Sequence, residues 1–292
     1  MMNIIGLRKW FYGLSLLIIL PGIASLIMFG LRPSIDFTGG TMIQIRPANQ
    51  ITIDKLRAVL ESNNLRDTMI QQSGNSFIIR TKPLSIEEQR SLVSSLESQL
   101  GKITFDKIDM VGPTVSAELV RQAIILVVVA SLLIILYLSL RYKPVFAICG
   151  VIALLHDVLV ITGLFSIFGV LFHEEVDSLF VTAVLSTIGY SMHDSIIIFD
   201  RIRENMKFIK KHSFEEIANF STLQTISRSI NTSFTVVLVL LSLLIFGSPV
   251  IKWFIIALLI GIISGTYSSI FNATALVVDW TNFRKRMKEK SK

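Results

Sequence analysis

Two aspartates lie inside long apolar runs of this sequence, and each directly follows a histidine. Asp157 follows His156, and Asp194 follows His193. A carboxylate within hydrocarbon is costly, so an ionisable residue inside a membrane span is by default a hypothesis of function. Carboxyl and imidazole groups can both bind and release protons. The two pairs therefore indicate a protein that moves protons or binds ions within a membrane.

The stretch before Asp194 carries further polar residues at helical spacing. Ser186, Tyr190 and Asp194 recur every fourth residue, and Thr187 and Ser191 lie beside them. A polar stripe on an otherwise apolar helix must face protein or water rather than lipid. Asp194 is thus a candidate proton carrier, and Tyr190 belongs to its surroundings. A structural hydrogen bond to a neighbouring helix is the alternative explanation.

Asp157 also lies in an apolar run. A purely structural role is a stronger alternative for Asp157 than for Asp194, because a His-Asp pair can simply tie helices together. Adjacent residues on a helix point about 100° apart, so a histidine and the aspartate after it cannot face the same partner. Arg228 is the predicted counter-charge for Asp194. Its guanidinium stays protonated, so it cannot itself carry a proton. It can only change how readily a nearby carboxylate binds one. An interfacial anchor is the alternative role of Arg228.

The elements that must position these residues are membrane helices. Apolar residues make up 52% of the 292-residue chain. They form runs long enough for helices of about 20 residues to cross a bilayer. Six spans are predicted, at 10–30, 121–140, 145–170, 178–199, 231–247 and 250–278. The pair Gly261 and Gly265, four residues apart in the last span, predicts a close helix contact.

The chain has a net charge of +7. The positions of its basic residues indicate the orientation of the helices in the membrane rather than a surface that binds nucleic acid. Lys and Arg gather at the N-terminus, after the second and fourth spans, and in the tail, whereas loop 171–177 is acidic. Basic loops remain in the cytoplasm. Both termini are therefore predicted to be cytoplasmic in a multi-pass membrane protein. We expect contact with anionic lipids but no nucleic-acid partner.

Four regions follow from this pattern. Residues 1–30 form a cytoplasmic N-terminus and a retained first helix, because the apolar run is longer than that of a signal peptide. Residues 31–119 form an exported domain. Residues 120–279 hold helices two to six, with a cytoplasmic amphipathic segment at 200–229, and residues 280–292 form a basic tail.

The hydrophobic spacing in the exported segment predicts strands and helices in the order β-α-β-β-α-β. This is the ferredoxin-like order. A hairpin is predicted at Ser73–Asn75, and Ser85 is predicted to cap a helix. The segment contains no histidine and no visible catalytic set. The fold class is thus an α-helical membrane protein with a small α+β domain between helices one and two.

Two connectors join this domain to the membrane helices. The first runs from Asp36 to Gly40 and includes Gly39, and the second contains Gly112 and Pro113. Glycine allows a tight bend or a close backbone approach. Both connectors are predicted hinges about which the domain swings as a body. A simple membrane-exit turn is the alternative for the first.

The sequence Gly189–Asn205 closely resembles the fourth-span motif of SecF proteins, in the SecD/SecF family of bacterial protein export. Motifs of the same family, in the same order, resemble Asp36–Gly40, Val111–Pro113, Leu155–Asp157 and Ser227–Ser233. The resemblance implies a six-helix half of RND type in the bacterial inner membrane, which pairs with SecD and associates with the SecYEG channel. YajC, YidC and an unfolded polypeptide in transit are further implied partners.

The same resemblance implies that proton flow drives the exported domain, with Asp194 as the carboxylate that carries protons and Arg228 as its regulating partner. Asp157 matches a family position as well. One departure concerns His193, which stands where the family usually has asparagine. A histidine adds a second group that can titrate near neutrality. It leaves open whether Asp194 alone sets the pH of coupling.

Two other functions compete with this interpretation. The first is half of a proton-driven small-molecule or lipid exporter of RND type. The second is an intramembrane protease, but the aspartyl type carries Gly-x-Gly-Asp where this chain has Ser-Met-His before Asp194. A zinc protease requires HExxH, which is absent. The single Cys149 can form neither a disulfide framework nor a CxxC site. We expect no enzymatic activity, no cofactor and no metal.

Overall fold

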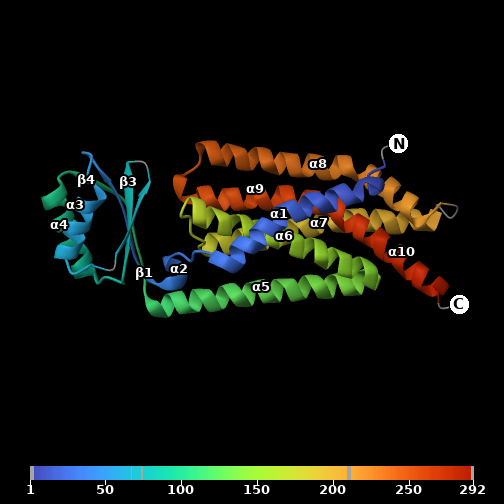
Figure 1. The fold of residues 1–292 in the computed structure, drawn as a ribbon, viewed down its shortest axis with the longest axis horizontal. Helices are drawn as coiled ribbons and strands as arrows, with labels where there is room; N and C mark the ends of the chain where they lie inside the picture. The colour runs from blue at the N-terminus through green and yellow to red at the C-terminus, as the bar shows by residue number, and fades with distance from the viewer. Residues whose placement is uncertain (1–2, 67, 74, 209–211, 291–292) are drawn as a thin grey trace. The chain divides into compact units, whose positions relative to one another are not determined.

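The computed structural model of the chain describes residues 3–66, 68–73, 75–208 and 212–290. It divides into two compact units. A helical unit comprises residues 1–32 and 126–292, and a mixed unit comprises residues 33–125. Figure 1 shows the helices and strands of both.

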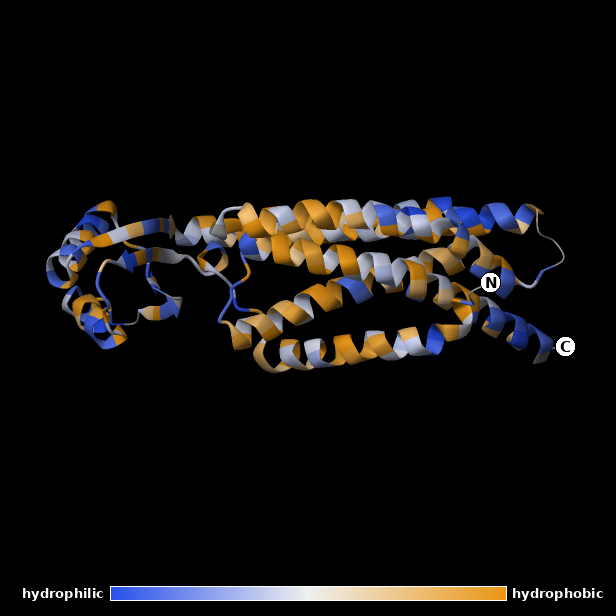
Figure 2. Ribbon diagram, turned by 90° about the horizontal axis from the view of Figure 1, so that it is seen from above, coloured by the Kyte–Doolittle hydropathy of each residue, from blue (hydrophilic) through white to orange (hydrophobic). Residues whose placement is uncertain are grey.

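Long helices form the helical unit, although the part of α5 before residue 126 belongs to the mixed unit. They are α1 (Arg8–Phe29), α5 (Pro113–Arg141), α6 (Pro144–Leu171), α7 (Ser178–Phe208), α8 (Phe214–Phe246), α9 (Lys252–Tyr267) and α10 (Thr274–Lys290), with short helices η1 (Ile5–Leu7) and η2 (Pro249–Ile251). A π-helix, η3 (Ser268–Ala273), joins α9 to α10. Within the described residues, six helical stretches are long and apolar enough to cross a membrane, as predicted. Figure 2 shows hydrophobic residues along them and hydrophilic residues where α10 ends.

Several helices extend beyond their predicted spans, and two of them change the interpretation of the segment between the fourth and fifth spans. α7 continues to Phe208 instead of ending near residue 199, and α8 already begins at Phe214. The segment predicted at 200–229 is therefore divided between the end of α7 and the start of α8, and its cytoplasmic, amphipathic character remains a prediction. Its residues 209–211 lie outside the described part of the chain.

The start of α8 explains this continuity. A capping box is present, because Ser213 Oγ accepts the N–H of Glu216 at 3.3 Å and the Glu216 carboxylate accepts the N–H of Ser213 at 2.8 Å. Such a box satisfies two backbone donors that a helix start leaves free. No Gly or Pro follows until Gly247, so the helix runs without a break from its cap through the span.

Small residues allow α9 to pack closely on α7. A Cβ atom built on Gly261 would lie 2.0 Å from Thr187 Oγ1, and one built on Gly265 would lie 2.8 Å from Ser191 Cβ. Only glycine fits at such distances. The helix contact predicted from the Gly261 and Gly265 spacing is therefore confirmed, and its partner is α7.

The mixed unit contains one antiparallel sheet and two covering helices. Its elements are α2 (Ile35–Thr38), β1 (Gly40–Pro47), α3 (Ile53–Ser62), β2 (Met69–Ser73), β3 (Ser76–Thr81), α4 (Ile86–Leu100) and β4 (Ile103–Val111). The strands are arranged in the order β2-β3-β1-β4. Ile43, Leu56, Ile79 and Leu96 are fully buried in a core shared by strands and helices. From β1 onward, strands and helices follow one another as predicted; the short helix α2 was not predicted.

Local signals in this unit are confirmed where the structure describes them. Ser85 caps α4, with its Oγ accepting the N–H of Glu88 at 3.2 Å. The Ser85 N–H donates to the Glu88 carboxylate at 2.7 Å, and this bond, together with the Ser85 hydroxyl, holds the pKa of the Glu88 carboxyl below its ordinary value. Strands β2 and β3 pair antiparallel from Met69 to Ser73, as the hairpin requires. Gly74 in its turn lies outside the described residues.

The two predicted hinge segments lie against each other at one end of the sheet. Gly39 and Gly40 have φ angles of +72° and +132°. Gly40 opens β1 opposite Val111, the last residue of β4. A Cβ atom on Gly39 would lie 3.7 Å from Pro113 Cα. Gly112 alone separates β4 from α5, which Pro113 begins. Motion about these segments remains a prediction.

Replacing Gly40 by alanine is expected to destabilise the protein by about 3 kcal/mol, because strain and a clash act together. Its φ disfavours a side chain, and a Cβ atom there would lie 2.7 Å from Thr81 O. Gly101→Ala is the matched control, since Gly101 has a φ of +85° but nothing within 4 Å of its added Cβ. Thermal unfolding of the full chain in detergent measures both. Equal losses of stability would contradict the clash.

Candidate functional site

Asp157 of α6 is held by hydroxyl groups from other helices. Ser191 of α7 donates to its Oδ2 at 2.5 Å and Ser268 of η3 at 2.7 Å, while Ser264 of α9 donates to Oδ1 at 2.8 Å. His156 Nδ1 lies 3.0 Å from Oδ1. These partners offset the cost of burying a carboxylate that is 1% exposed. Asp157 therefore ties α6 to α7 and to the α9–η3 stretch.

Asp194 of α7 is equally buried but has fewer partners. Ser229 of α8 and Thr266 of α9 lie beside its carboxyl group. Among the described residues, neither Asp194 Oδ2 nor Ser229 Oγ has a hydrogen-bond partner. Leaving a buried polar atom unpaired costs about 1–3 kcal/mol. Asp194 is thus enclosed by protein yet incompletely hydrogen-bonded, in contrast to Asp157.

Tyr190 joins the surroundings of Asp194. Its hydroxyl donates to Ser233 Oγ at 3.2 Å, and Ser233 Oγ lies 2.6 Å from Thr266 Oγ1. Tyr190, Asp194, Ser229, Ser233 and Thr266 form what we call the α7–α9 polar cluster. It brings together the predicted residues Tyr190 and Asp194, one helical turn apart, against α8 and α9.

Arg228 and His193 do not point into this cluster. Both side chains are exposed. Arg228 forms no ion pair with any other residue that the structure describes. The expected approach of Arg228 to Asp194 is therefore not seen. Helix geometry gives the reason, because α8 turns Ser229 inward and adjacent residues diverge by about 100°.

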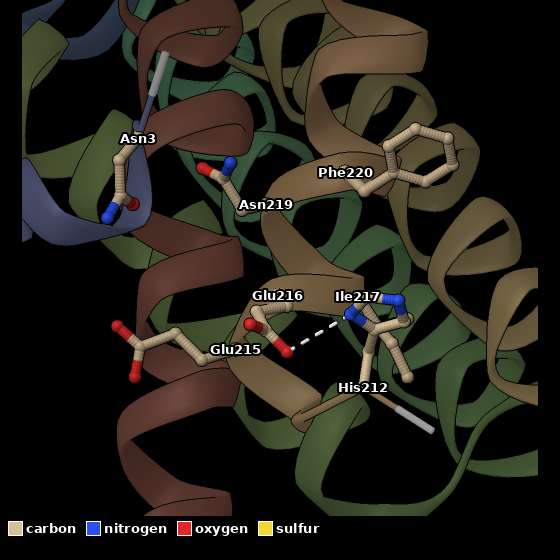
Figure 3. A pocket seen from close by; sticks show the side chains of 7 residues that line it. All are labelled: Asn3, His212, Glu215, Glu216, Ile217, Asn219 and Phe220. Carbon is tan, nitrogen blue, oxygen red and sulfur yellow. Dashed lines mark ion pairs between the residues drawn. The ribbon is translucent and has the colours of Figure 1, made fainter. Parts of the chain in front are cut away.

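A cavity of ≈ 490 Å³ lies where α8 begins, lined by Asn3, His212, Glu215, Glu216, Ile217, Asn219 and Phe220 (Figure 3). Figure 3 shows Glu216 turned toward His212, and His212 Nδ1 lies 3.3 Å from Glu216 Oε2. Asn219 Oδ1 accepts the N–H groups of Ile4 and Ile5 at 2.8 and 3.2 Å. These contacts fasten the N-terminal segment to α8, and we assign the region a structural role.

Two protein-family models match this chain. A family model described as "Protein export membrane protein SecD/SecF, C-terminal" matches residues 92–283, and one described as "SecD/SecF GG Motif" matches residues 24–50. The chain belongs to the SecD/SecF family. Gly39 and Gly40 fall within the second match. The resemblance inferred from Gly189–Asn205 is therefore confirmed at the level of the family.

SecF relatives match nearly the whole chain. The protein translocase subunit SecF of Thermobaculum terrenum is 44% identical over 97% of this chain and 95% of its own length. SecF of Escherichia coli O157:H7 is 36% identical over 95% of this chain and 87% of its own. The protein translocase subunit SecDF of Thermus thermophilus is 36% identical over 97% of this chain, but over only 39% of its own length.

A solved structure agrees with this. The crystal structure of SecDF from Thermus thermophilus, described as a translocon-associated membrane protein, matches with a TM-score of 0.86 at 35% identity. The match covers 96% of this chain and 39% of that one. The chain thus corresponds to about two fifths of the longer SecDF protein.

Sequence reasoning missed the role of two serines. Ser264 and Ser268 were not predicted to belong to the site, yet both donate to Asp157. Their four-residue spacing within an apolar span was the available signal, because it places two hydroxyl groups on one helix face. Which helix they would meet could not be read from that spacing.

Proposed function

We propose that this protein is an accessory subunit of the Sec translocase that uses the proton gradient to promote polypeptide export across the bacterial inner membrane. Membership of the SecD/SecF family supports the translocase role. Asp194 carries the proton part of the proposal. Its carboxyl group is buried by protein within a membrane helix, and its Oδ2 has no hydrogen-bond partner among the described residues.

Proton binding and release at Asp194 would couple to a rearrangement of α7 against α8. A proton can shift a two-state equilibrium only if the two states bind it with different affinity. Asp194 meets this condition if Arg228 approaches it in one state and leaves it in the other. Tyr190 and Asp157 would have different roles in this rearrangement. Tyr190 links α7 to α8 through Ser233. Asp157 keeps α6, α7 and the α9–η3 stretch together.

The exposed side chains of His193 and Arg228 support a membrane partner. Both lie on helices long and apolar enough to span the bilayer, where a polar side chain facing lipid is unfavourable. SecD is the partner we propose for this face, since SecDF of Thermus thermophilus carries both names in one chain. SecYEG, YajC, YidC and the polypeptide in transit complete the proposed assembly.

The mixed unit is proposed to be the exported, ferredoxin-like domain of an RND-type half. Gly39–Gly40 and Gly112–Pro113 would act as its two hinges, with Asp36 at the start of the first. Because these segments lie together at one end of the sheet, one movement there would carry the whole domain. Both termini would remain cytoplasmic, following the positive charge of the tail.

Translocation in membrane vesicles tests the proposal. Vesicles depleted of their own SecF are supplied with this chain and SecD, and uptake of an exported preprotein is followed with and without an uncoupler. We expect this chain to accelerate uptake only while the proton gradient persists, and to copurify with SecD. Acceleration that survives the uncoupler would contradict proton coupling.

His193→Asn is expected to shift the pH dependence of this acceleration by about one unit, the usual spread of side-chain titration in proteins. The imidazole points away from the cluster, but it belongs to the residue next to Asp194, and a charge this near acts on a carboxylate through space. The measurement is preprotein uptake across a series of pH values. His212→Asn at the exposed start of α8 is the control, and identical shifts in both variants would argue against a role of His193.

A further inference from the structure

Besides the α7–α9 polar cluster, the helical unit contains a second chain of polar groups, which begins at Asp157. His156 Nδ1 lies 3.0 Å from Asp157 Oδ1, and His156 Nε2 lies 3.1 Å from Ser15 Oγ of α1. Asn272 of η3 donates from Nδ2 to the same Ser15 oxygen at 2.7 Å. Ser15 and Asn272 are both buried. The imidazole therefore bridges a carboxylate and a buried hydroxyl group.

This arrangement accepts either tautomer of His156. With the proton on Nδ1, the ring donates to Asp157 and accepts from Ser15. With the proton on Nε2, the ring donates to Ser15 and accepts from a protonated Asp157. In the second case the Ser15 hydroxyl can turn to Tyr267, whose oxygen lies 3.3 Å away and itself donates to Phe11 O. Rotation of one hydroxyl group thus keeps every member satisfied.

A crevice of ≈ 420 Å³ opens beside this chain, between α1, α6 and the α10 end of η3. Its polar lining is Tyr12, Ser15, His156 and Asn272, and the remaining lining is apolar. Asn272 is 3% exposed, and among the described residues its Oδ1 has no hydrogen-bond partner. A water molecule occupies about 30 Å³ and binds where polar partners are available. The crevice has room for water, and the His156 side chain in its lining is 11% exposed, so it offers a polar partner there.

The far end of the crevice reaches the side of the helical unit where α1 begins. The Tyr12 hydroxyl donates to Asp279 Oδ2 at 3.1 Å, and Asp279 Oδ1 lies 2.8 Å from Arg8 Nε. Asp279 is partly exposed. The titratable groups that face this path from the packed elements are therefore Arg8 and Tyr12 of α1, Cys149 of α6, Tyr267 of α9 and Asp279 of α10.

We propose that His156 and Ser15 relay protons between Asp157 and water in this crevice, on the membrane side that carries both termini. In one step, a hydronium ion in the crevice gives a proton to Ser15 Oγ and becomes water, Ser15 gives its own proton to His156 Nε2, and His156 Nδ1 gives its proton to Asp157. One proton moves to Asp157, and the reverse order returns it. Asn272 positions Ser15. The relay rests on the proposed proton-driven function.

Proton flux through the complex tests the relay. The full chain is reconstituted with SecD in liposomes containing a pH-sensitive dye, and a potassium diffusion potential drives proton uptake. We expect His156→Gln to lower the flux about 100-fold, the low end of what a positioned proton-transferring side chain contributes. Ser15→Ala is expected to lower it about tenfold, and Ser15→Thr, which keeps the hydroxyl group, to restore it within about twofold.

Ser25→Ala is the matched control. Ser25 also lies in α1, is similarly buried, and bonds α6 through Ser166 Oγ at 2.7 Å, but lies outside the relay. Thermal unfolding confirms that each variant is folded before its flux is compared. Wild-type flux in both His156→Gln and Ser15→Ala would overturn the relay and leave the proposed function intact. A wild-type complex that conducts no protons would overturn both.

Discussion

Export by the Asp194→Asn variant is expected to fall to the rate that the wild type shows without a proton gradient. Asparagine is nearly isosteric with aspartate but cannot bind and release a proton near neutral pH. It also keeps an oxygen acceptor beside Ser229 and Thr266, so packing within the α7–α9 polar cluster should persist. The measurement is gradient-dependent preprotein uptake in vesicles that contain equal amounts of each variant.

Asp200→Asn provides the matched control for this substitution. Asp200 lies in the same helix and pairs with Arg141 and Arg203, but its side chain is 37% exposed. Exposed ion pairs contribute about 0–1 kcal/mol, so the control should change neither stability nor uptake by much. An Asp194→Asn variant that still responds fully to the gradient would refute the role of Asp194 as carrier. The same loss in both variants would show that any lost charge on α7 impairs export.

Replacing Gly261 by valine is expected to separate α7 from α9, with a loss of stability of about 3 kcal/mol or more. A Cβ atom at Gly261 would lie 2.0 Å from Thr187 Oγ1 and 2.6 Å from Thr187 Cγ2, so one or both helices must move. The movement would also pull Ser264 and Ser191 apart, which both donate to Asp157. Thermal unfolding in detergent and the amount of protein in the membrane measure the effect.

Two further variants separate a clash from a general loss of helix packing. Gly13→Ala adds a methyl group where nothing lies within 4 Å, so it should leave stability unchanged. Combining Gly261→Ala with Thr187→Gly removes the atoms that collide. The double variant should lose less stability than the two single variants added together, as residues in direct contact do. Strict additivity would contradict the proposed contact.

Much of the fold could be predicted from the sequence because the signals are local. A span is recognised by the summed hydrophobicity of about 20 neighbouring residues, and strands and helix caps by spacings of two to four. Thus six spans, the Ser85 cap and the order of strands and helices were all predicted. The end of α7 was not predicted, because Asp200–Phe208 is polar. These residues nevertheless continue the helix beyond the hydrophobic run.

The candidate site was predicted only in part. Asp157 and Asp194 stand out in the sequence because each is a carboxylate in an apolar run, and that alone marks them. Which of the two is fully hydrogen-bonded depends on the residues that face them. Asp157 meets Ser264 and Ser268, more than 100 positions away. Nothing in the local pattern of α6 specifies that meeting.

The amino-acid sequence by itself determined the number of spans, the family and the position of the two buried aspartates, since each depends on residue type along the chain. Only the tertiary structure decided that Arg228 faces outward, that Ser15 and Asn272 adjoin His156, and that Gly22 packs against Gly163, where an added Cβ would lie 2.9 Å from the facing Cα. The reason is that the rotation of each helix about its axis, and the neighbours it contacts, depend on how all the helices pack together. Whether a buried carboxyl group finds hydrogen-bond donors follows from that packing.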